Sequence, residues 1–481
     1  MSPQSVGFSL LILSVGLLIG KMIRVKVRWV QRLFLPSSIV GGVILLMLGP
    51  QVLGRIPGPW GETGLLTQAM VTTWSALPGL LISVVFATMF LGQDLPSPKR
   101  AAKLVGPQLA LGTAFASSQY VVGLLLAALI LVPFFGSSPI TGGLIEIGFE
   151  GGHGTAAGMR DVMVKLGFTD GADLAVGIAT VGLVSGIIVG ITLINWGVRN
   201  GKTEILKNDV QLSIDEQRGL FRKDEYYSAG KMTSRPASVE PLSLHIAIMA
   251  LAILIGWLIL EGLRWIESVT YASVMIGENT PLEIFTYVPL FPMALIGGAI
   301  LQLIAKALGV SHVIDPQMML RIQGWALDFL VISAIATVSI KAVGENLGAF
   351  LVLSVGGIVI NLVLFLWLTP RVIGRFWFER GIGDLGQSMG VTATGVILMR
   401  ITDPNASSPA FEAFGYKQLI FEPFFGGGLV TAMAIPIIYL TGVWPLFFVM
   451  LTIFVVAVLV GLFHFGPKEQ RDREAWLAQQ T

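Results

Sequence analysis

Gly148-Phe149-Glu150-Gly151-Gly152-His153-Gly154-Thr155-Ala156-Ala157-Gly158 is the stretch of this sequence that decides its architecture. It places glycines, a carboxylate, an imidazole and a hydroxyl in a chain that is otherwise rich in hydrocarbon. Inside a bilayer, a polar and helix-breaking segment persists only where it is buried in protein or lines a water-filled cavity. The stretch therefore predicts a binding site within a membrane protein, and with it transport of a solute.

The composition places the whole chain in the membrane class. Of its 481 residues, 54% are hydrophobic and 12% are charged, and the mean hydropathy is +0.79. Apolar runs long enough to cross a bilayer recur throughout. The net charge of +2 sits in loops between these runs, so we expect no nucleic-acid partner. The absence of cysteine excludes disulfides, thiolate metal sites and a cysteine nucleophile.

The apolar runs predict eleven full spans, since about 20 apolar residues cross a bilayer. They fall near 6–21, 37–54, 70–93, 104–133, 174–197, 243–265, 284–308, 324–342, 346–370, 418–441 and 443–464. The first run is followed, not preceded, by its basic cluster, which predicts an uncleaved span rather than a signal peptide. Two further segments, 140–165 and 383–402, are rich in glycine and polar residues and lack an unbroken apolar run.

The distribution of Lys and Arg predicts that these two segments dip into the membrane and return. Basic residues should concentrate on the cytoplasmic side. If 140–165 is re-entrant, the strongly basic connector 198–242 lies in the cytoplasm; if it crosses, the connector lies outside. The re-entrant reading agrees with the other loops, with the N-terminus outside and the C-terminus cytoplasmic.

The resulting pattern is an all-α integral membrane protein with an inverted-topology repeat. The first repeat is 1–197 with a hairpin at 140–165, and a cytoplasmic linker follows at 198–242. The second, inverted repeat is 243–441 with a hairpin at 383–402, followed by an extra span and tail at 442–481. Within the first repeat, the stretch from Pro36 to Gly42 predicts a helix start with small residues for close packing.

The two hairpin tips are the predicted site. Helix N-termini suit carboxylates, whereas C-terminal carbonyls and threonine hydroxyls suit Na⁺. The predicted substrate-binding residues are Gly152, His153, Gly154, Thr155, Thr392, Ala393, Thr394 and Arg400. The predicted cation-binding residues are Glu150, Thr155, Gly390 and Thr392. No nucleophile, base and orienting group occur together, so we expect no enzyme.

Each residue also has a structural interpretation. Thr155 and Thr392 could bond a backbone carbonyl one turn back, and His153 could hold its turn. A carboxylate at the bilayer centre costs roughly 2.5–3.5 kcal/mol, so it needs a partner or a function. Glu146 could pair with Arg160, while Glu150 could bind a cation or a proton.

The roles of three more charged residues stay open. Arg400 could clamp a substrate carboxylate or extend to the cytoplasmic face. Asp328 and Glu422 lie near the cytoplasmic ends of spans, where both could reach interfacial water.

The chain resembles the bacterial sodium/glutamate symporter family. The resemblance rests on the strings at 35–42, 151–155, 167–170 and 390–395, and it extends from the first span to about residue 441. It implies Na⁺-coupled import of glutamate across a bacterial inner membrane by an elevator-type movement. It also implies a homodimer embedded in lipid, with Na⁺ as the coupling ion and no organic cofactor.

Four features depart from the family pattern. Glu150 and Glu422 are acids where a small polar and an apolar residue are expected, hairpin two lacks an expected proline, and 443–464 is an added span. The nearest alternative is therefore the same architecture carrying a di- or tricarboxylate, or coupled to protons. A different class would be a channel-like protein, or one that binds a lipid or a quinone.

Overall fold

The computed structural model describes residues 3–93, 98–206, 214–270, 275–276, 280–281, 285–404 and 406–478. Within these ranges the regular secondary structure is helical apart from two short antiparallel strands, β1 (Met275–Ile276) and β2 (Thr280–Pro281). The predicted all-α class is confirmed. The side chains of 98–104 and parts of the predicted linker lie outside the described residues.

Ten helices of the described chain are long and apolar enough to cross a membrane, which identifies an integral membrane protein. The prediction of eleven continuous spans is wrong at 418–441. There, α19 (Ala410–Phe421) ends, and α20 (Leu429–Thr441) begins only after a turn. Pro423 and the three glycines at 426–428 interrupt the helix, because proline lacks an N–H and Gly426 and Gly427 adopt positive φ angles.

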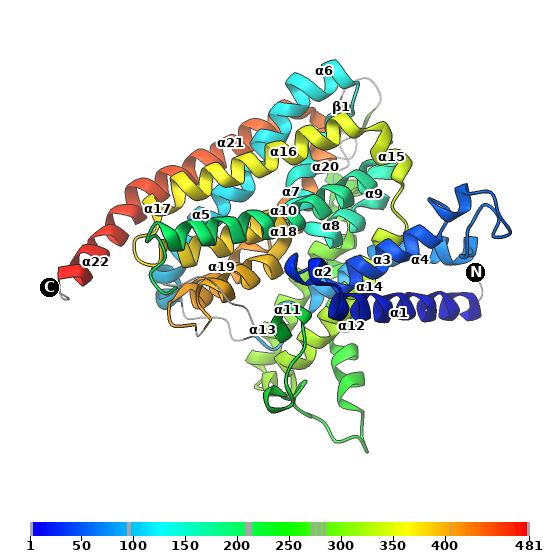
Figure 1. The fold of residues 1–481 in the computed structure, drawn as a ribbon, viewed down its shortest axis with the longest axis horizontal. Coiled ribbons are helices and arrows are strands. Elements are labelled where there is room, and N and C mark those ends of the chain that lie inside the picture. The colour runs from blue at the N-terminus through cyan, green and yellow to red at the C-terminus, as the bar shows by residue number, and fades with distance from the viewer. Residues whose placement is uncertain are drawn as a thin grey trace. The chain divides into compact units, whose positions relative to one another are not determined.

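The chain forms two compact units that interleave along the sequence. Figure 1 labels their helices in chain order. Unit 1 comprises residues 1–94, 157–173 and 213–344. Its helices are α1 (Pro3–Lys26), α2 (Arg28–Arg32), α3 (Ser37–Leu48), α4 (Gln68–Thr88), α9 (Arg160–Lys165), α11 (Ile214–Arg218), α12 (Pro241–Thr270), α13 (Leu290–Ala307), α14 (Pro316–Ala336) and most of α15 (Ile340–Glu345). Short 3-10 turns lie at η1 (Leu53–Arg55), η4 (Lys223–Glu225) and η5 (Ser311–Val313).

Unit 2 comprises residues 95–156, 174–212 and 345–481. Its helices are α5 (Pro98–Leu126), α6 (Val132–Phe135), α7 (Leu144–Phe149), most of α8 (Gly152–Gly158) and of α10 (Gly171–Arg199), α16 (Leu347–Val363), α17 (Thr369–Val372), α18 (Trp377–Thr402), α19, α20, α21 (Val443–Leu459) and α22 (Gly466–Ala478). A 3-10 turn, η3 (Pro139–Gly143), precedes α7. Short π-helical stretches, η2 (Ala127–Leu131), η6 (Leu364–Leu368) and η7 (Val460–Phe465), continue α5, α16 and α21.

Unit 1 is held by close helix packing around an apolar core. As predicted, a helix starts at Ser37, and α3 lies so near α1 that a Cβ on Gly41 would be 2.5 Å from the Gly16 carbonyl oxygen. Trp74 is fully buried, and its indole Nε1 donates to the Ser9 carbonyl at 3.0 Å. The small residues thus allow α1, α3, α4 and α14 to surround one core.

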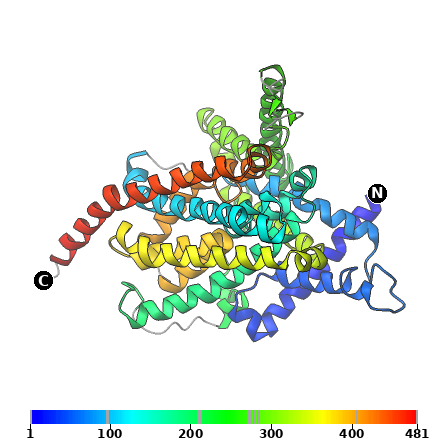
Figure 2. The same cartoon turned by 90° about the horizontal axis from the view of Figure 1, so that it is seen from above.

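Three long helices form one face of unit 2. α5 packs against both α16 and α21, and Figure 2 shows it between them. The broken segments α7 and α18 pack against α5 as well. These long helices therefore provide the support on which the two glycine-rich segments rest.

Each unit draws on both predicted repeats. The first three long helices of each predicted repeat lie in unit 1, namely α1, α3 and α4 from one and α12, α13 and α14 from the other. The fourth helix and the glycine-rich segment that follows it lie in unit 2, apart from residues 157–165. The units are thus distinct from the repeats.

Candidate substrate and cation site

The segment α18 is a helical hairpin. Its backbone leaves helical geometry at Gly390 (φ −152°, ψ 40°) and Val391 (φ 60°, ψ 173°). The two arms then lie against each other, since a Cβ on Gly386 would be 2.7 Å from the Gly395 Cα. Nearer the base, a Cβ on Gly383 would be 2.6 Å from the Met399 sulfur. Glycine is required where the arms touch, and the chain reverses at Val391.

The first glycine-rich segment is a series of short helices. Helices α7, α8 and α9 contain six, seven and six residues, each about 9–11 Å long at 1.5 Å per residue. The break between α7 and α8 has Gly152 at φ 69°. A Cβ on Gly152 would be 2.2 Å from Cγ1 of Val391, so this break touches the tip of the α18 hairpin.

Strain is concentrated at this contact. Val391 is β-branched, yet it adopts a positive φ, which such residues rarely do. Conformations of this kind cost of order 1–3 kcal/mol and persist only when surrounding structure imposes them. Behind the tip, a Cβ on Gly182 of α10 would be 2.2 Å from the Met389 carbonyl oxygen. The tip is therefore fixed between α10 and the first broken segment.

Glu146 of α7 is fully buried and well supplied with donors. Tyr120 donates its hydroxyl to Oε2 at 2.7 Å, and Oε1 accepts from the Gly426 N–H at 2.9 Å and the Thr431 hydroxyl at 2.8 Å. These donors come from α5, from the break before α20 and from α20 itself. The carboxylate thus joins three elements, and it has a structural role.

Glu150 is buried to 3% exposure, but neither carboxylate oxygen has a hydrogen-bond partner in the described chain. The charged groups that act on it are Lys417, Glu146 and Asp384, and the Ser388 hydroxyl lies beside it. The Ser388 Oγ also lacks a partner there. A buried carboxylate with so few donors is costly unless a cation or a proton neutralises it.

An ion pair lies next to this carboxylate. Lys417 of α19 and Asp384 of α18 are both fully buried, and Nζ is 3.2 Å from Oδ1. Nζ also donates to Gln387 Oε1 at 2.6 Å and lies 4.0 Å from the centre of the Phe421 ring. Gln108 of α5 donates to the other Asp384 oxygen at 2.6 Å.

The backbone of the hairpin tip is anchored from two further helices. Gln119 of α5 and Asn361 of α16 both donate to the Ser388 carbonyl, at 2.7 and 2.9 Å. Gln119 Oε1 has no partner in the described residues. An amide oxygen, a hydroxyl and a carboxylate therefore lie in one buried region with spare acceptor capacity.

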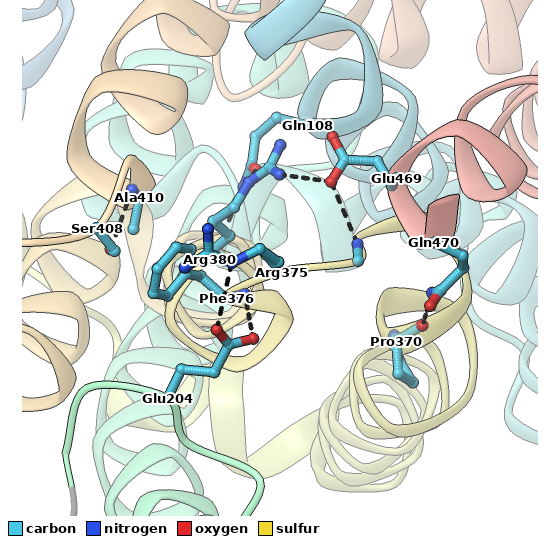
Figure 3. A network of polar contacts seen from close by, with 11 residues as sticks. Gln108, Glu204, Pro370, Arg375, Phe376, Arg380, Ser408, Ala410, Glu469 and Gln470 are labelled. Atoms are coloured by element: carbon cyan, nitrogen blue, oxygen red, sulfur yellow. Dashed lines mark hydrogen bonds and ion pairs between the residues drawn. The ribbon is translucent and has the colours of Figure 1, made fainter. Parts of the chain in front are cut away.

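At the base of the hairpin, a second network binds the C-terminal helix (Figure 3). Arg380 donates to Gln108 Oε1 at 3.1 Å and to Glu469 Oε2 of α22 at 3.2 Å. Glu204 accepts from the Phe376 N–H at 2.8 Å. Through Gln108, this network is continuous with Asp384 and so with Lys417.

The predicted threonines occupy different environments. Thr392 is half-buried and donates to Glu422 Oε1 at 2.9 Å, while Gln418 donates to Thr392 at 2.7 Å. Thr394 is buried and bonds the Gly390 carbonyl at 2.5 Å, one turn back. Thr155 is buried, and its hydroxyl has no partner within the described residues.

The other predicted residues of the first segment are enclosed. Gly154 is buried, and His153 is 6% exposed with Nε2 3.0 Å from the Thr180 hydroxyl. Thr180 donates its only proton to the Val176 carbonyl, so His153 Nε2 must donate to Thr180. His153 thus holds the segment against α10.

Two predicted residues lie on the surface of unit 2. Ala393 is exposed beside the tip. Arg400 is exposed in the last turn of α18, nine residues beyond Val391 and thus about 13 Å along the arm. Arg400 therefore does not join the cluster at the tip.

The suggested pairing of Glu146 with Arg160 is wrong. Arg160 instead donates to Asp173 at 2.7 Å, within unit 1. Tyr120 and Thr431 satisfy Glu146, and these two residues gave no local sequence signal. Asp328 is exposed on α14 of unit 1 and takes no part in the unit 2 cluster.

Known proteins are similar to this chain in sequence. A sequence model of the sodium/glutamate symporter family matches residues 5–403, from the first span through the α18 hairpin. The chain is similar to the sodium/glutamate symporter of Escherichia coli (strain K12), with 26% identity over 247 residues, 51% of this chain and 55% of that protein. The similarity to the sodium/glutamate symporter of Shigella flexneri has the same extent.

The chain spans about half the length of the curated relatives it matches. The family match ends before α19, so Lys417, Gln418, Glu422 and Thr431 lie beyond it. Both broken segments lie inside it. Because the match covers most of the sequence, the chain belongs to the sodium/glutamate symporter family.

Proposed function

We propose that this protein is a secondary active transporter that imports glutamate together with Na⁺. The observation that supports this most directly is the Glu150 carboxylate, which is buried beside the hairpin tip and lacks a donor among the described residues. A cation is the natural partner for such a group. The family to which the chain belongs names both solutes.

The chain offers oxygen ligands for Na⁺ in this region. Besides Glu150, the hydroxyls of Ser388 and Thr155 are buried and unpartnered within the described chain. Carboxylate and hydroxyl oxygens suit a hard cation. Gly390 and Thr392, which the sequence also suggested, already have internal partners, so Glu150 is the proposed central ligand.

The substrate would bind at the accessible side of the same tip. Thr392 is half-buried and Ala393 is exposed, whereas Gly152, His153 and Gly154 are enclosed. The second arm of α18 begins here, and its free N–H groups suit a carboxylate. An anionic substrate beside Glu150 and Glu422 is repelled unless a cation is bound, which provides a physical basis for coupling.

The predicted membrane arrangement completes the proposal. Both glycine-rich segments enter the membrane as re-entrant hairpins from opposite faces of an inverted repeat, with the N-terminus outside and the C-terminus cytoplasmic. Unit 2 carries the proposed site, so it would move as an elevator against unit 1. Unit 1 would then form the static part of a homodimer in the bacterial inner membrane.

Uptake into proteoliposomes tests the function. Purified protein should accumulate labelled glutamate when Na⁺ is imposed outside, and an equal K⁺ gradient should give only background uptake. Unlabelled di- and tricarboxylates serve as competitors. Accumulation of one of these in place of glutamate, or no Na⁺-driven flux of any of them, would contradict the proposal.

A second candidate is proton coupling, because Glu150 could be neutralised by a proton as well as by Na⁺. Uptake driven by a pH gradient in the absence of Na⁺ would favour it. Saturable Na⁺ stimulation at constant pH would exclude it.

A further inference from the structure

Lys417 is the least expected charged residue in unit 2. Its side chain is fully buried, and it approaches α18 and α5 closely. A Cβ on Gly112 of α5 would be 2.4 Å from the Lys417 Cε, so the glycine provides the room that the lysine stem needs. Neither this stem nor its charge is required to fill an apolar core, which a leucine would do at lower cost.

The charges around Lys417 do not balance. Its ammonium pairs with Asp384 at 3.2 Å, yet it also acts on Glu150 and on Glu422. The same ammonium donates to Gln387 Oε1 at 2.6 Å, so it already contacts two groups of α18. One ammonium therefore acts on three carboxylates, of which Asp384 is also acted on by the Arg380 guanidinium.

We propose that Lys417 is a resident counter-cation that the coupling ion displaces from Glu150. When Na⁺ occupies Glu150, the ammonium stays with Asp384 and Gln387. When Na⁺ has left, the ammonium is shared between Asp384 and Glu150, so the empty site keeps a cation. The inference rests on the proposed function. It adds a role for Lys417 in the step in which the empty carrier moves back across the membrane.

The physical reason is the cost of moving an uncompensated charge. Removing one partner of a buried pair leaves a charge that strongly destabilises its surroundings. An empty carrier must carry Glu150 back across the membrane, and a tethered ammonium removes that penalty. Lysine suits this role because it is a compact charge on a flexible stem of four carbons.

The test separates net uptake from exchange. Net uptake requires the empty carrier to return, whereas exchange of labelled for unlabelled glutamate, with Na⁺ saturating on both sides, does not. In Lys417→Met we expect net uptake to fall about tenfold, equivalent to a barrier about 1.4 kcal/mol higher, and exchange to stay within about twofold. The matched control is Lys306→Met, an exposed lysine on α13 of unit 1, which should change neither rate.

A second variant distinguishes a transport defect from a folding defect. Lys417→Met combined with Asp384→Asn removes both members of the ion pair and leaves no new unpaired carboxylate there. It should show the same selective loss of net uptake. Equal loss of both modes, or normal net uptake in this double variant, overturns the role of Lys417. Absence of Na⁺-driven uptake in the unmodified protein would instead overturn the proposed function.

Discussion

Glu146 and Glu150 lie one helical turn apart, and the Glu150 N–H donates to the Glu146 carbonyl at 3.0 Å, but their carboxylates have opposite surroundings. Glu146 accepts three hydrogen bonds, and Glu150 accepts none from the described residues. Both are buried. The first is thus a structural link between helices, and the second is the proposed cation ligand.

Replacing Glu146 with glutamine should destabilise the protein. The amide can accept at only one of its two positions, so a donor from Tyr120, Gly426 or Thr431 is left unsatisfied. We expect a loss of about 1–3 kcal/mol, seen as a lower Tm in detergent. An unchanged Tm would show that these contacts do not support the fold.

Replacing Glu150 with glutamine should have the reverse effect. The neutral amide is cheaper to bury than a carboxylate, so the Tm should stay the same or rise. Stimulation of glutamate binding by Na⁺ should disappear. Titration of bound glutamate against Na⁺ checks this, and a Glu150→Gln protein that keeps the full Na⁺ response would remove Glu150 from the cation site.

Substitutions of Thr155 and Thr392 should affect cation binding and substrate binding separately. Thr155→Ala removes an unpartnered hydroxyl, so we expect weaker Na⁺ activation with little loss of stability. Thr392→Ala should raise the apparent KM for glutamate about tenfold, a loss of about 1.4 kcal/mol. Thr441→Ala, which loses only a bond to the Ile437 carbonyl, is the control. If both variants transport normally with unchanged apparent affinity, the site is wrongly assigned.

Contact between the tips can be tested by adding one methyl group. Gly152→Ala places a Cβ 2.2 Å from Val391, and we expect transport to be lost. Gly136→Ala is the matched control, since Gly136 also has a positive φ (62°) but has nothing within 4 Å of its Cβ position. Both substitutions cost about 1–2 kcal/mol from backbone strain. Rescue of Gly152→Ala by Val391→Gly would identify the steric contact, whereas equal effects at both glycines would argue against it.

Much of the helical arrangement follows from the sequence because long apolar runs have few alternatives in a membrane. Glycines and small polar residues predict a hairpin within 383–402, and the helix breaks inside this range, at Gly390 and Val391. The break after Phe421 differs from the predicted span 418–441, because the high average hydropathy of that segment outweighs Pro423 and the glycines at 426–428.

The partners of the site residues could not be predicted in the same way. Lys417 lies one residue before the predicted span 418–441, so the hydropathy pattern gives no reason to expect it in a buried site. Its pairing with Asp384 depends on how α19 packs against α18, which no local pattern specifies. The link from Glu146 to Thr431 joins residues 285 positions apart, beyond the reach of any periodicity.

That separation also has a consequence during synthesis. At about 5–20 residues per second, the ribosome makes Thr431 on the order of 15 s to a minute after Glu146. Until then the nascent chain contains the Glu146 carboxylate without the Gly426 N–H and the Thr431 hydroxyl, which donate to its Oε1. The buried contacts of Glu146 are therefore completed only when the last quarter of the polypeptide is made, and a ribosome stalled before α20 would leave an inserted but incompletely folded chain exposed to quality-control proteases.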